Sequence, residues 1–325
     1  MATNCAFGPL GVNGWVGGLC TCLESKGNPV ENIDVSSLSV GVVGGFSDKG
    51  HRADAAFGKG GARERRDMYT FGNGATYEGE WCGTLRDGYG VQVWPDDARY
   101  EGQWISDKAQ GMGKFFHTDG DVYMGEWWDD KAHGHGVYNH SDGSMYEGQW
   151  SQDKQHGNGT EVWPDNARYM GEYKNGLKEG IGQFFWADGS TYQGEFQDNN
   201  IHGDGVYCWG DGRSYNGQWV HNRMHGSGRF TWKDGRCFEG EYQNDHKDGH
   251  GVFRWPDGRM YEGQWKDGKQ NGTGIYYSAL GDRRAGEWED GRRIRWVDPP
   301  LESPTEEVKT ATGPVAAMEI AKVSA

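Results

Sequence analysis

The chain has 325 residues, of which 56 are glycine and 16 are tryptophan, and its formal net charge at pH 7 is −15. Phosphate backbones and anionic lipid headgroups repel so acidic a chain, which excludes nucleic acid as an expected partner and disfavours a membrane. An aromatic content of 14% argues against an unstructured chain, because disordered segments are poor in aromatic residues.

Residues 1–67 are rich in glycine and lack hydrophobic periodicity, so we predict that they are mostly disordered. Residues 1–25 show no basic start followed by an apolar block, and we therefore expect no secretory signal and a cytoplasmic location. The cysteines show no framework spacing, which predicts free thiols in a reducing compartment. Cys20 and Cys22 lack the further ligands of a zinc site, and we expect no cofactor or metal.

A folded domain is predicted for residues 68–297, beginning with an incomplete hairpin. Residues 68–71, followed by Asn73 and Gly74, resemble the second strand and turn of a hairpin whose first strand is missing, and should cap one end of a sheet.

From Tyr77 onward the chain repeats itself every 23 residues. The motif Tyr-Glu-Gly-Glu-Trp at 77–81 recurs in nine in-phase copies up to the one that begins at Tyr261, and a degenerate tenth copy begins at Arg284. Each full copy also carries a Gly-x-Gly triplet at a fixed distance, the first at 88–90. Because no insertion breaks the phase, each unit should pack on the next with one geometry, as in a solenoid.

Each repeat predicts two short strands and two turns. One strand holds the Tyr-x-Gly-x-Trp block, and the other begins at Gly-x-Gly and ends near a Trp such as Trp255. The turn into the next unit is Pro-Asp-Gly in its clearest copy, at 256–258, with glycine where φ must be positive. Asn166 and Asp97 take the glycine position in two copies. A polar turn, such as the one at 107–108, joins the two strands of a unit.

The turn chemistry also predicts the register. If the Pro-Asp-Gly turn is a three-residue loop with a glycine bulge, Phe184 lies opposite Tyr192, Gly182 opposite Gly194 and Gly180 opposite Phe196. This register gathers the rings on one face, whereas a one-residue slip would scatter them over both. A valine at position 180 should then collide with the Phe196 ring.

The predicted fold class is all-β: an elongated, single-layer antiparallel sheet of stacked hairpins, curled into a trough with one aromatic face. Isolated hairpins are marginal in water, so the units must stack edge to edge. Two strands per unit at about 4.8 Å each make nine units roughly 85 Å long.

The motif, its Gly-x-Gly and its 23-residue period resemble the MORN-repeat family over residues 77 to about 290. The resemblance implies a solenoid of stacked hairpins that tethers partners in cytoskeletal, ciliary or membrane-contact assemblies, and it implies dimerisation as one alternative. Tyr173, Phe196 and Tyr242 replace the Trp of the motif, and the copy at Arg284 lacks its tyrosine and its Gly-x-Gly.

The aromatic face is the candidate partner-binding surface. It comprises Trp94, Trp163, Tyr169, Trp186, Tyr192, Phe196, Trp209, Tyr215, Trp232 and Trp255. His117 and His140 stand where other units have Trp. Either the two imidazoles simply replace indole rings in the packing, or they form a polar notch that holds a ligand or partner.

Other repeated polar residues favour structural or solvent roles. A row of acids and amides at the fourth motif position should lie on the solvated face: Glu80, Gln103, Glu126, Gln149, Glu172, Glu195, Gln218, Glu241, Gln264 and Glu287. His133, His156, His202 and His225 share one position, but equivalent atoms of neighbouring hairpins lie roughly 10 Å apart, too far for one zinc ion. No nucleophile or phosphate-loop signature occurs, so we expect no enzyme and no catalytic residue.

The last elements complete the prediction. Ile294, Trp296 and Val297 predict a final strand, and the tail 298–325, rich in proline, glutamate and alanine, predicts a short helix over 315–323.

The leading functional hypothesis is a non-catalytic intracellular scaffold with protein partners, cytoskeletal or ciliary among them. Lipid or membrane association is the first alternative. An accessory module of a phosphoinositide-kinase or methyltransferase system is the second.

Overall fold

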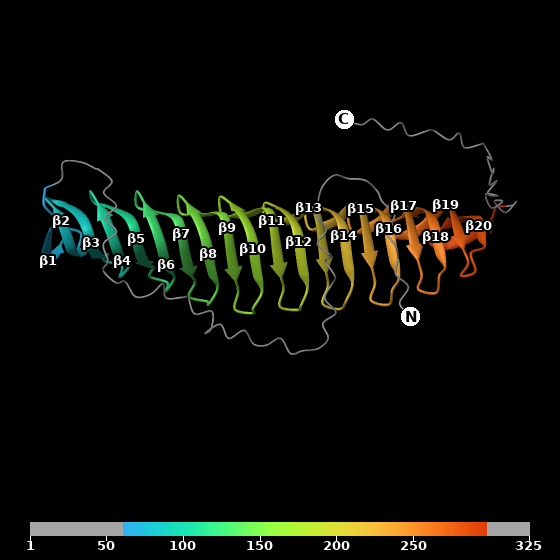
Figure 1. The fold of residues 1–325 in the computed structure, drawn as a ribbon, viewed down its shortest axis with the longest axis horizontal. Helices are drawn as coiled ribbons and strands as arrows, with labels where there is room; N and C mark the ends of the chain where they lie inside the picture. Colours follow the sequence, from blue (N-terminus) through green and yellow to red (C-terminus); the bar gives the residue numbers. More distant parts are fainter. Residues whose placement is uncertain (1–60, 298–325) are drawn as a thin grey trace, which may run out of the picture. The chain divides into compact units, whose positions relative to one another are not determined.

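The computed structural model describes residues 61–297, which contain a single 21-stranded antiparallel sheet (Figure 1). Each strand pairs with the strand that follows it along the chain, so the first and last strands form the two edges of the sheet. The predicted fold class is therefore confirmed. The predictions of disorder and of a C-terminal helix fall on residues 1–60 and 298–325, outside the described part.

The strands alternate between seven and nine residues over most of the sheet. They are β1 (Glu64–Thr70), β2 (Thr76–Cys82), β3 (Leu85–Val93), β4 (Arg99–Ile105), β5 (Lys108–Phe116), β6 (Val122–Trp128), β7 (Lys131–Asn139), β8 (Met145–Ser151), β9 (Lys154–Val162), β10 (Arg168–Lys174), β11 (Leu177–Phe185), β12 (Thr191–Gln197), β13 (Asn200–Cys208), β14 (Ser214–Val220), β15 (Arg223–Thr231), β16 (Cys237–Gln243), β17 (His246–Arg254), β18 (Met260–Lys266), β19 (Lys269–Tyr277), β20 (Arg283–Glu289) and β21 (Arg292–Trp296). Strand β1 thus begins before the predicted Met68.

The turn after each nine-residue strand has the predicted bulged form. After β11, the Trp186 N–H donates to the Ser190 carbonyl at 2.9 Å and the Gly189 N–H donates to the Trp186 carbonyl at 3.0 Å. Gly189 has φ 83°, and its counterparts Asn166 and Asp97 have φ 66° and 67°. The register follows: Phe184 pairs with Tyr192, Gly182 with Gly194 and Gly180 with Phe196, all as predicted.

The turn after each seven-residue strand ties neighbouring hairpins together. Ser106 and Asp107 both have positive φ, which is typical of a two-residue type I′ turn. The Asp107 N–H donates to the Arg86 carbonyl at 2.9 Å, and the Arg86 N–H donates to the Asp107 carboxylate at 2.8 Å. The same pair of bonds recurs at Asp130 and Asp153, so the row of turns is itself a hydrogen-bonded ladder.

The row of acids and amides has a structural role that sequence reasoning did not foresee. The Glu80 carboxylate accepts the N–H of Tyr89, the middle residue of Gly-x-Gly, at 2.6 Å. This bond recurs at Gln103, Glu126, Gln149, Glu172, Glu195, Gln218 and Gln264. Most of the row is exposed, as predicted, yet it caps a bulge at which the first glycine of each triplet has positive φ. The predicted exposure therefore holds for most of the row, and the hydrogen bonds to the bulge are a further, structural role of these side chains.

The same bulge corrects the expected effect of a side chain at Gly180. A Cβ there would meet the Glu172 carboxylate first, at 2.7 Å, and the residue has φ 66°. Backbone strain and the displaced bulge cap should together lower the free energy of unfolding of Gly180→Val by about 1–3 kcal/mol. Chemical denaturation followed by far-ultraviolet circular dichroism measures the change. The neighbouring exposed Ile181→Val should stay within about 0.5 kcal/mol of wild type. Equal stability of the two variants would contradict the account.

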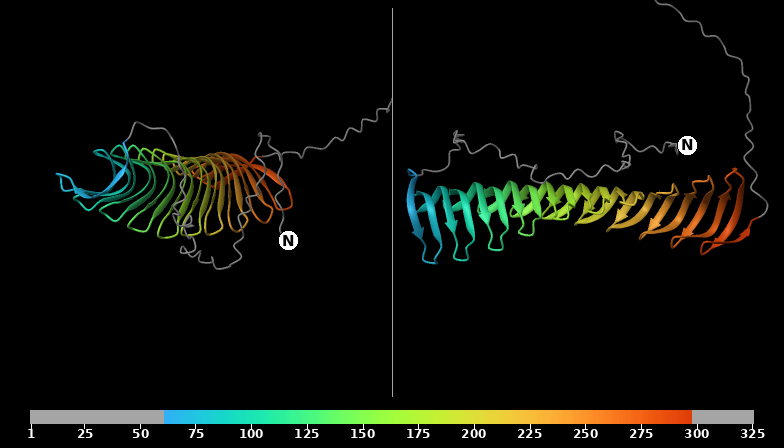
Figure 2. Two further views of the ribbon diagram at one scale, coloured as in Figure 1. Left: turned by 60° about the vertical axis from the view of Figure 1, so that its left-hand side comes forward. Right: turned by 90° about the horizontal axis from the view of Figure 1, so that it is seen from below.

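The core consists of tyrosine rings lying over glycines. A Cβ at Gly205 would collide with the Tyr192 ring, and the Tyr192 hydroxyl donates to the Glu195 carbonyl at 3.0 Å. The centroids of the Tyr192 and Phe196 rings lie 5.2 Å apart, although a flat strand would separate such residues by about 13 Å. Each strand therefore bends toward its aromatic face, and the sheet is a curled trough (Figure 2).

Candidate functional site: the aromatic trough

Six half-buried tryptophans line the trough where the nine-residue strands end: Trp94, Trp163, Trp186, Trp209, Trp232 and Trp255. Each packs against a ring of the next hairpin, and the last four also pack against a ring of their own hairpin. Trp186, for example, lies 4.4 Å from Phe184 and 4.9 Å from Tyr207 between ring centroids. Such contacts form a ladder from Trp163 to Trp255. We call these six side chains the tryptophan ladder.

Four of the candidate residues lie beneath this ladder. Tyr169, Tyr192, Phe196 and Tyr215 are at most 5% exposed, so their rings offer little surface to a partner. They form the floor of the trough and hold its shape. Burial therefore narrows the candidate surface to the tryptophan ladder.

Hollows open between the rungs of the ladder. One of about 460 Å³ is lined by Phe184, Trp186 and Phe196 among others. A second, of about 330 Å³, lies between Trp186 and Trp209. These hollows offer recesses for side chains of a bound partner.

His117 and His140 continue the ladder between Trp94 and Trp163. The His117 ring lies 4.5 Å from Phe115 and 5.7 Å from Tyr138, and the His140 ring lies 4.6 Å from Tyr138. Both imidazoles are exposed. A hollow of about 320 Å³ lies beside His117, so the structure brings a polar side chain to a recess, while its ligand-binding role stays a prediction.

Asp121 is the anion of this region, and sequence reasoning missed it. Its carboxylate lies 2.9 Å from His140 Nδ1 and accepts the Ser141 N–H at 2.8 Å. The Ser141 N–H above all, with hydrogen bonds from Tyr138 and His140, lowers the pKa of Asp121 to about 2. The available signal was an acidic residue after the Asp-Gly turn, where most other units carry Ala, Ser or Arg, such as Ala98, Ser144 and Arg213.

The depressed pKa of Asp121 predicts a pH-dependent stability. Its folded pKa lies below the unfolded value of about 3.9, so the ionised group stabilises the fold above that value. This contribution is lost as the pH falls through about 2. The difference in melting temperature between wild type and Asp121→Asn should therefore shrink between about pH 5 and about pH 2. A constant difference across a pH series of thermal melts would contradict the assignment.

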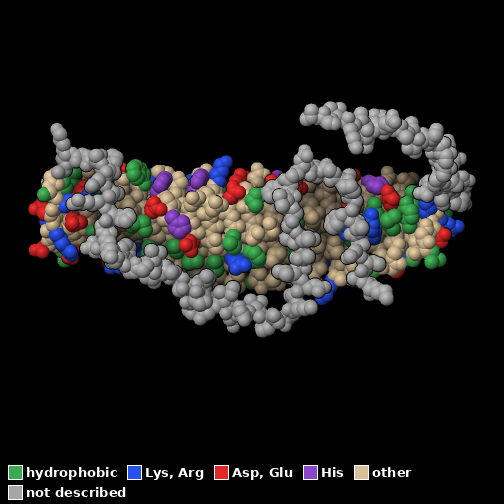
Figure 3. Space-filling model, in the orientation of Figure 1, with side chains coloured by type: hydrophobic (Ala, Val, Ile, Leu, Met, Phe, Trp, Pro, Cys, Tyr) green, Lys and Arg blue, Asp and Glu red, His purple; other side chains and the backbone are tan. Residues whose placement is uncertain are grey.

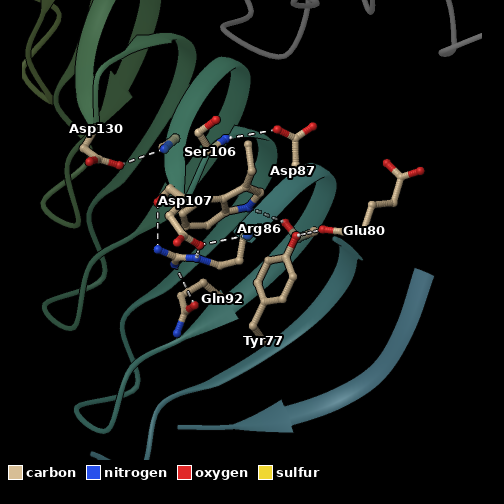
Figure 4. Close-up of polar contacts among 11 residues, drawn as sticks. Tyr77, Glu80, Arg86, Asp87, Gln92, Ser106, Asp107 and Asp130 are labelled. Carbon is tan, nitrogen blue, oxygen red and sulfur yellow. Dashed lines mark hydrogen bonds and ion pairs between the residues drawn. The ribbon is translucent and has the colours of Figure 1, made fainter. Parts of the chain in front are cut away.

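Basic side chains also reach the floor of the trough. The Arg86 guanidinium lies 4.0 Å from the Trp104 ring centroid and 3.1 Å from the Asp107 carboxylate, and it donates to Gln92 at 2.9 Å (Figure 4). At the equivalent position four repeats later, Lys178 lies 2.7 Å from Glu161. The hydroxyl of Tyr173 donates to the same carboxylate at 3.0 Å.

Among residues 61–297, no three His, Cys, Asp or Glu side chains are grouped as the ligands of a metal ion would be. Within that range, no helix long and apolar enough to cross a membrane occurs.

The fold and the site define a class: a solenoid of stacked β-hairpins with one open aromatic trough. The MORN repeat matches residues 77–99, 100–122, 123–145, 146–168, 169–191, 192–212, 215–235, 238–258 and 261–283, which is more than half of the chain. The chain belongs to the MORN-repeat family.

Other comparisons give weaker likenesses. No curated protein sequence matches the chain. The TCP10 domain of Danio rerio CPAP, in complex with a peptide of STIL, is 12% identical with a TM-score of 0.40 and covers 73% of this chain and 100% of that one. The SAS-4 TCP domain of Drosophila melanogaster, with a proline-rich motif of Ana2, is 12% identical with a TM-score of 0.32, covering 48% and 84%. Virginiamycin B lyase of Staphylococcus aureus is 11% identical with a TM-score of 0.14, covering 70% and 74%. These TM-scores are too low to carry an argument.

Proposed function

We propose that this protein is a non-catalytic intracellular scaffold that binds a protein partner along its aromatic trough. The observation that carries the proposal is the tryptophan ladder: large, half-exposed rings in a row on the inner face of the sheet. Buried aromatic anchors dominate protein interfaces, and rows of partly exposed rings of this kind mark interaction sites.

The shape of the trough favours an extended partner. The hollows between Trp186, Trp209 and their neighbours are open along one line, so a strand or helix of the partner can place successive side chains in them. The cytoplasmic location, the cytoskeletal or ciliary partners and the alternative of a homodimer belong to this proposal and stay predictions.

A site-specific crosslinker tests the proposal in the full chain. A photo-reactive phenylalanine analogue in place of Met224, which lines the hollow beside Trp209, should crosslink a protein in cell extract. The same analogue in place of Ile181, an exposed residue in the middle of a Gly-x-Gly triplet, is the matched control and should not. Trp209→Ala should abolish the Met224 crosslink while the variant still melts cooperatively.

Two results would contradict the proposal. Equal crosslinking from both positions would show that the trough is not the binding surface. Salt-sensitive sedimentation with phosphatidylserine vesicles near 0.15 M salt, lost on neutralising Arg292, Arg293 and Arg295, would favour the lipid alternative. On the described part of the face in Figure 3, charged, histidine and hydrophobic side chains are interspersed, and no continuous apolar patch appears.

A further inference from the structure

Lys247 occupies the same repeat position as Arg86 and Lys178 on the floor of the trough. Its ammonium group lies among four rings, at 4.9 Å from the centroid of Trp232, 5.1 Å from Phe238, 5.1 Å from Phe253 and 5.0 Å from Trp265. A cation among aromatic faces is stabilised electrostatically, but a cation removed from water also needs an anion or hydrogen-bond acceptors. Among residues 61–297, the Lys247 ammonium group has these ring contacts but no carboxylate or hydrogen-bond acceptor paired with it.

The equivalent site at Lys178 shows what is missing. There Glu161 accepts from both Lys178, at 2.7 Å, and the Tyr173 hydroxyl, at 3.0 Å. The residue in the place of Glu161 at the later site is Phe230, which carries no acceptor.

Tyr242 gives independent evidence for the missing anion. It stands in the place of Tyr173 and pairs with Lys247 across β16 and β17. Tyr242 is 4% exposed, and its hydroxyl oxygen is a buried polar atom with no hydrogen-bond partner among the described residues. At the earlier site Glu161 accepts from a lysine and from a tyrosine hydroxyl. The equivalent groups at the later site, on Lys247 and Tyr242, therefore have no such carboxylate among the described residues.

Further basic side chains lie on tryptophan rings in the repeats around Lys247. Arg213, Arg236 and Arg259 rest on the rings of Trp209, Trp232 and Trp255, at 5.3, 5.4 and 5.4 Å. Each also pairs with an Asp of its own turn, Asp211, Asp234 or Asp257. The earlier units carry Ala98, Asp121, Ser144, Ala167 and Ser190 at the arginine position, so these arginine–aspartate pairs belong to the later units.

We propose that the trough between Trp209 and Trp265 binds an extended partner segment through a carboxylate side chain that pairs with the Lys247 ammonium group. The inference rests on the proposed function and names the chemistry of the partner. The bound carboxylate takes the part that Glu161 plays at Lys178, and the flanking tryptophans hold the apolar side chains beside it. Burial lowers the pKa of Lys247 to about 8, with a further lowering by the charge of Arg236, so a paired carboxylate should raise it again.

A random peptide library displayed on phage tests the inference with the full-length protein. Selection on wild type should enrich peptides with Asp or Glu at one fixed position, flanked by apolar residues. Selection on Lys247→Met, which keeps the length of the side chain and removes its charge, should lose that acid. The control is Gln270→Met, the same position one repeat later, and it should keep the acid.

A double-mutant comparison measures how much the pairing of the peptide carboxylate with Lys247 contributes to binding. Replacing the acid of a selected peptide by its amide should weaken binding to wild type by about tenfold or more, as expected when one partner of a desolvated charge pair is removed. The same replacement should leave binding to Lys247→Met nearly unchanged. An acid preference that persists in Lys247→Met, or peptides selected without any acid, would overturn the inference.

The remaining outcomes separate this inference from the proposed function. Peptides whose binding requires Trp209 but not Lys247 would support the trough as the binding surface and contradict the pairing of a carboxylate with Lys247. Peptides that need neither would remove the proposed function itself. If peptides bind only after Glu302, Glu306 and Glu307 are changed to Gln, the acidic tail of the chain is the occupant, and the assignment to a partner is wrong.

Discussion

Tyr192→Ala is expected to lower the free energy of unfolding by about 3–5 kcal/mol, the usual cost of truncating a large buried ring. The Tyr192 ring is 1% exposed and covers Gly194 and Gly205, so its removal opens a cavity that glycines cannot fill. Chemical denaturation followed by far-ultraviolet circular dichroism measures the change. Because each hairpin contacts only its neighbours, hydrogen exchange should accelerate most in β11, β12 and β13.

Tyr192→Phe is the matched control, since Phe238 occupies the same repeat position naturally and is fully buried. This variant keeps the ring and loses only the hydrogen bonds of the hydroxyl, to the Glu195 carbonyl at 3.0 Å and to the His202 carbonyl at 3.4 Å, so it should cost about 1 kcal/mol. Alanine and phenylalanine variants of equal stability would show that the ring does not hold the hairpin.

Lys178→Met is expected to destabilise the protein by about 2–3 kcal/mol, because it leaves a largely buried carboxylate without its cation. The side chains of Lys178 and Glu161 are 15% and 20% exposed and pair at 2.7 Å. Lys247→Met removes the same charge at the equivalent position, where no carboxylate is paired with it, and should be neutral or stabilising. Urea denaturation of the two variants side by side measures the contrast.

The double variant Lys178→Met/Glu161→Gln supplies the control, since it removes both charges at once. It should recover part of the stability lost in Lys178→Met. Equal destabilisation by Lys178→Met and Lys247→Met would contradict the difference between the two sites on which the carboxylate inference rests.

The 23-residue period and the residues of the turns predicted most of the fold. Glycine, Asn166 or Asp97 at the position of positive φ identified a bulged three-residue turn, and that turn determines which residues face each other. Once Gly182 is opposite Gly194, the two-residue alternation of a strand places Tyr192 and Phe184 on one face. These steps use contacts between residues close in the chain, which is why sequence reasoning reached them.

The parts that sequence reasoning missed depend on contacts between hairpins. Asp107 bonds to Arg86 across 21 residues, and Asp121 accepts from Ser141 across 20. Whether a half-buried charge is paired is decided by which residue of the preceding hairpin lies over it.

By itself the sequence determined the repeat, the register of its hairpins and the single aromatic face, because local turn geometry and strand alternation dictate all three. Only the tertiary structure decided which rings are buried in the core and which line an open trough. It also showed that Lys178 is paired with Glu161, whereas Phe230 stands in the place of Glu161 beside Lys247. The reason is physical: burial and charge pairing depend on the bend of the strands and on the stacking of neighbouring repeats, which no single repeat contains.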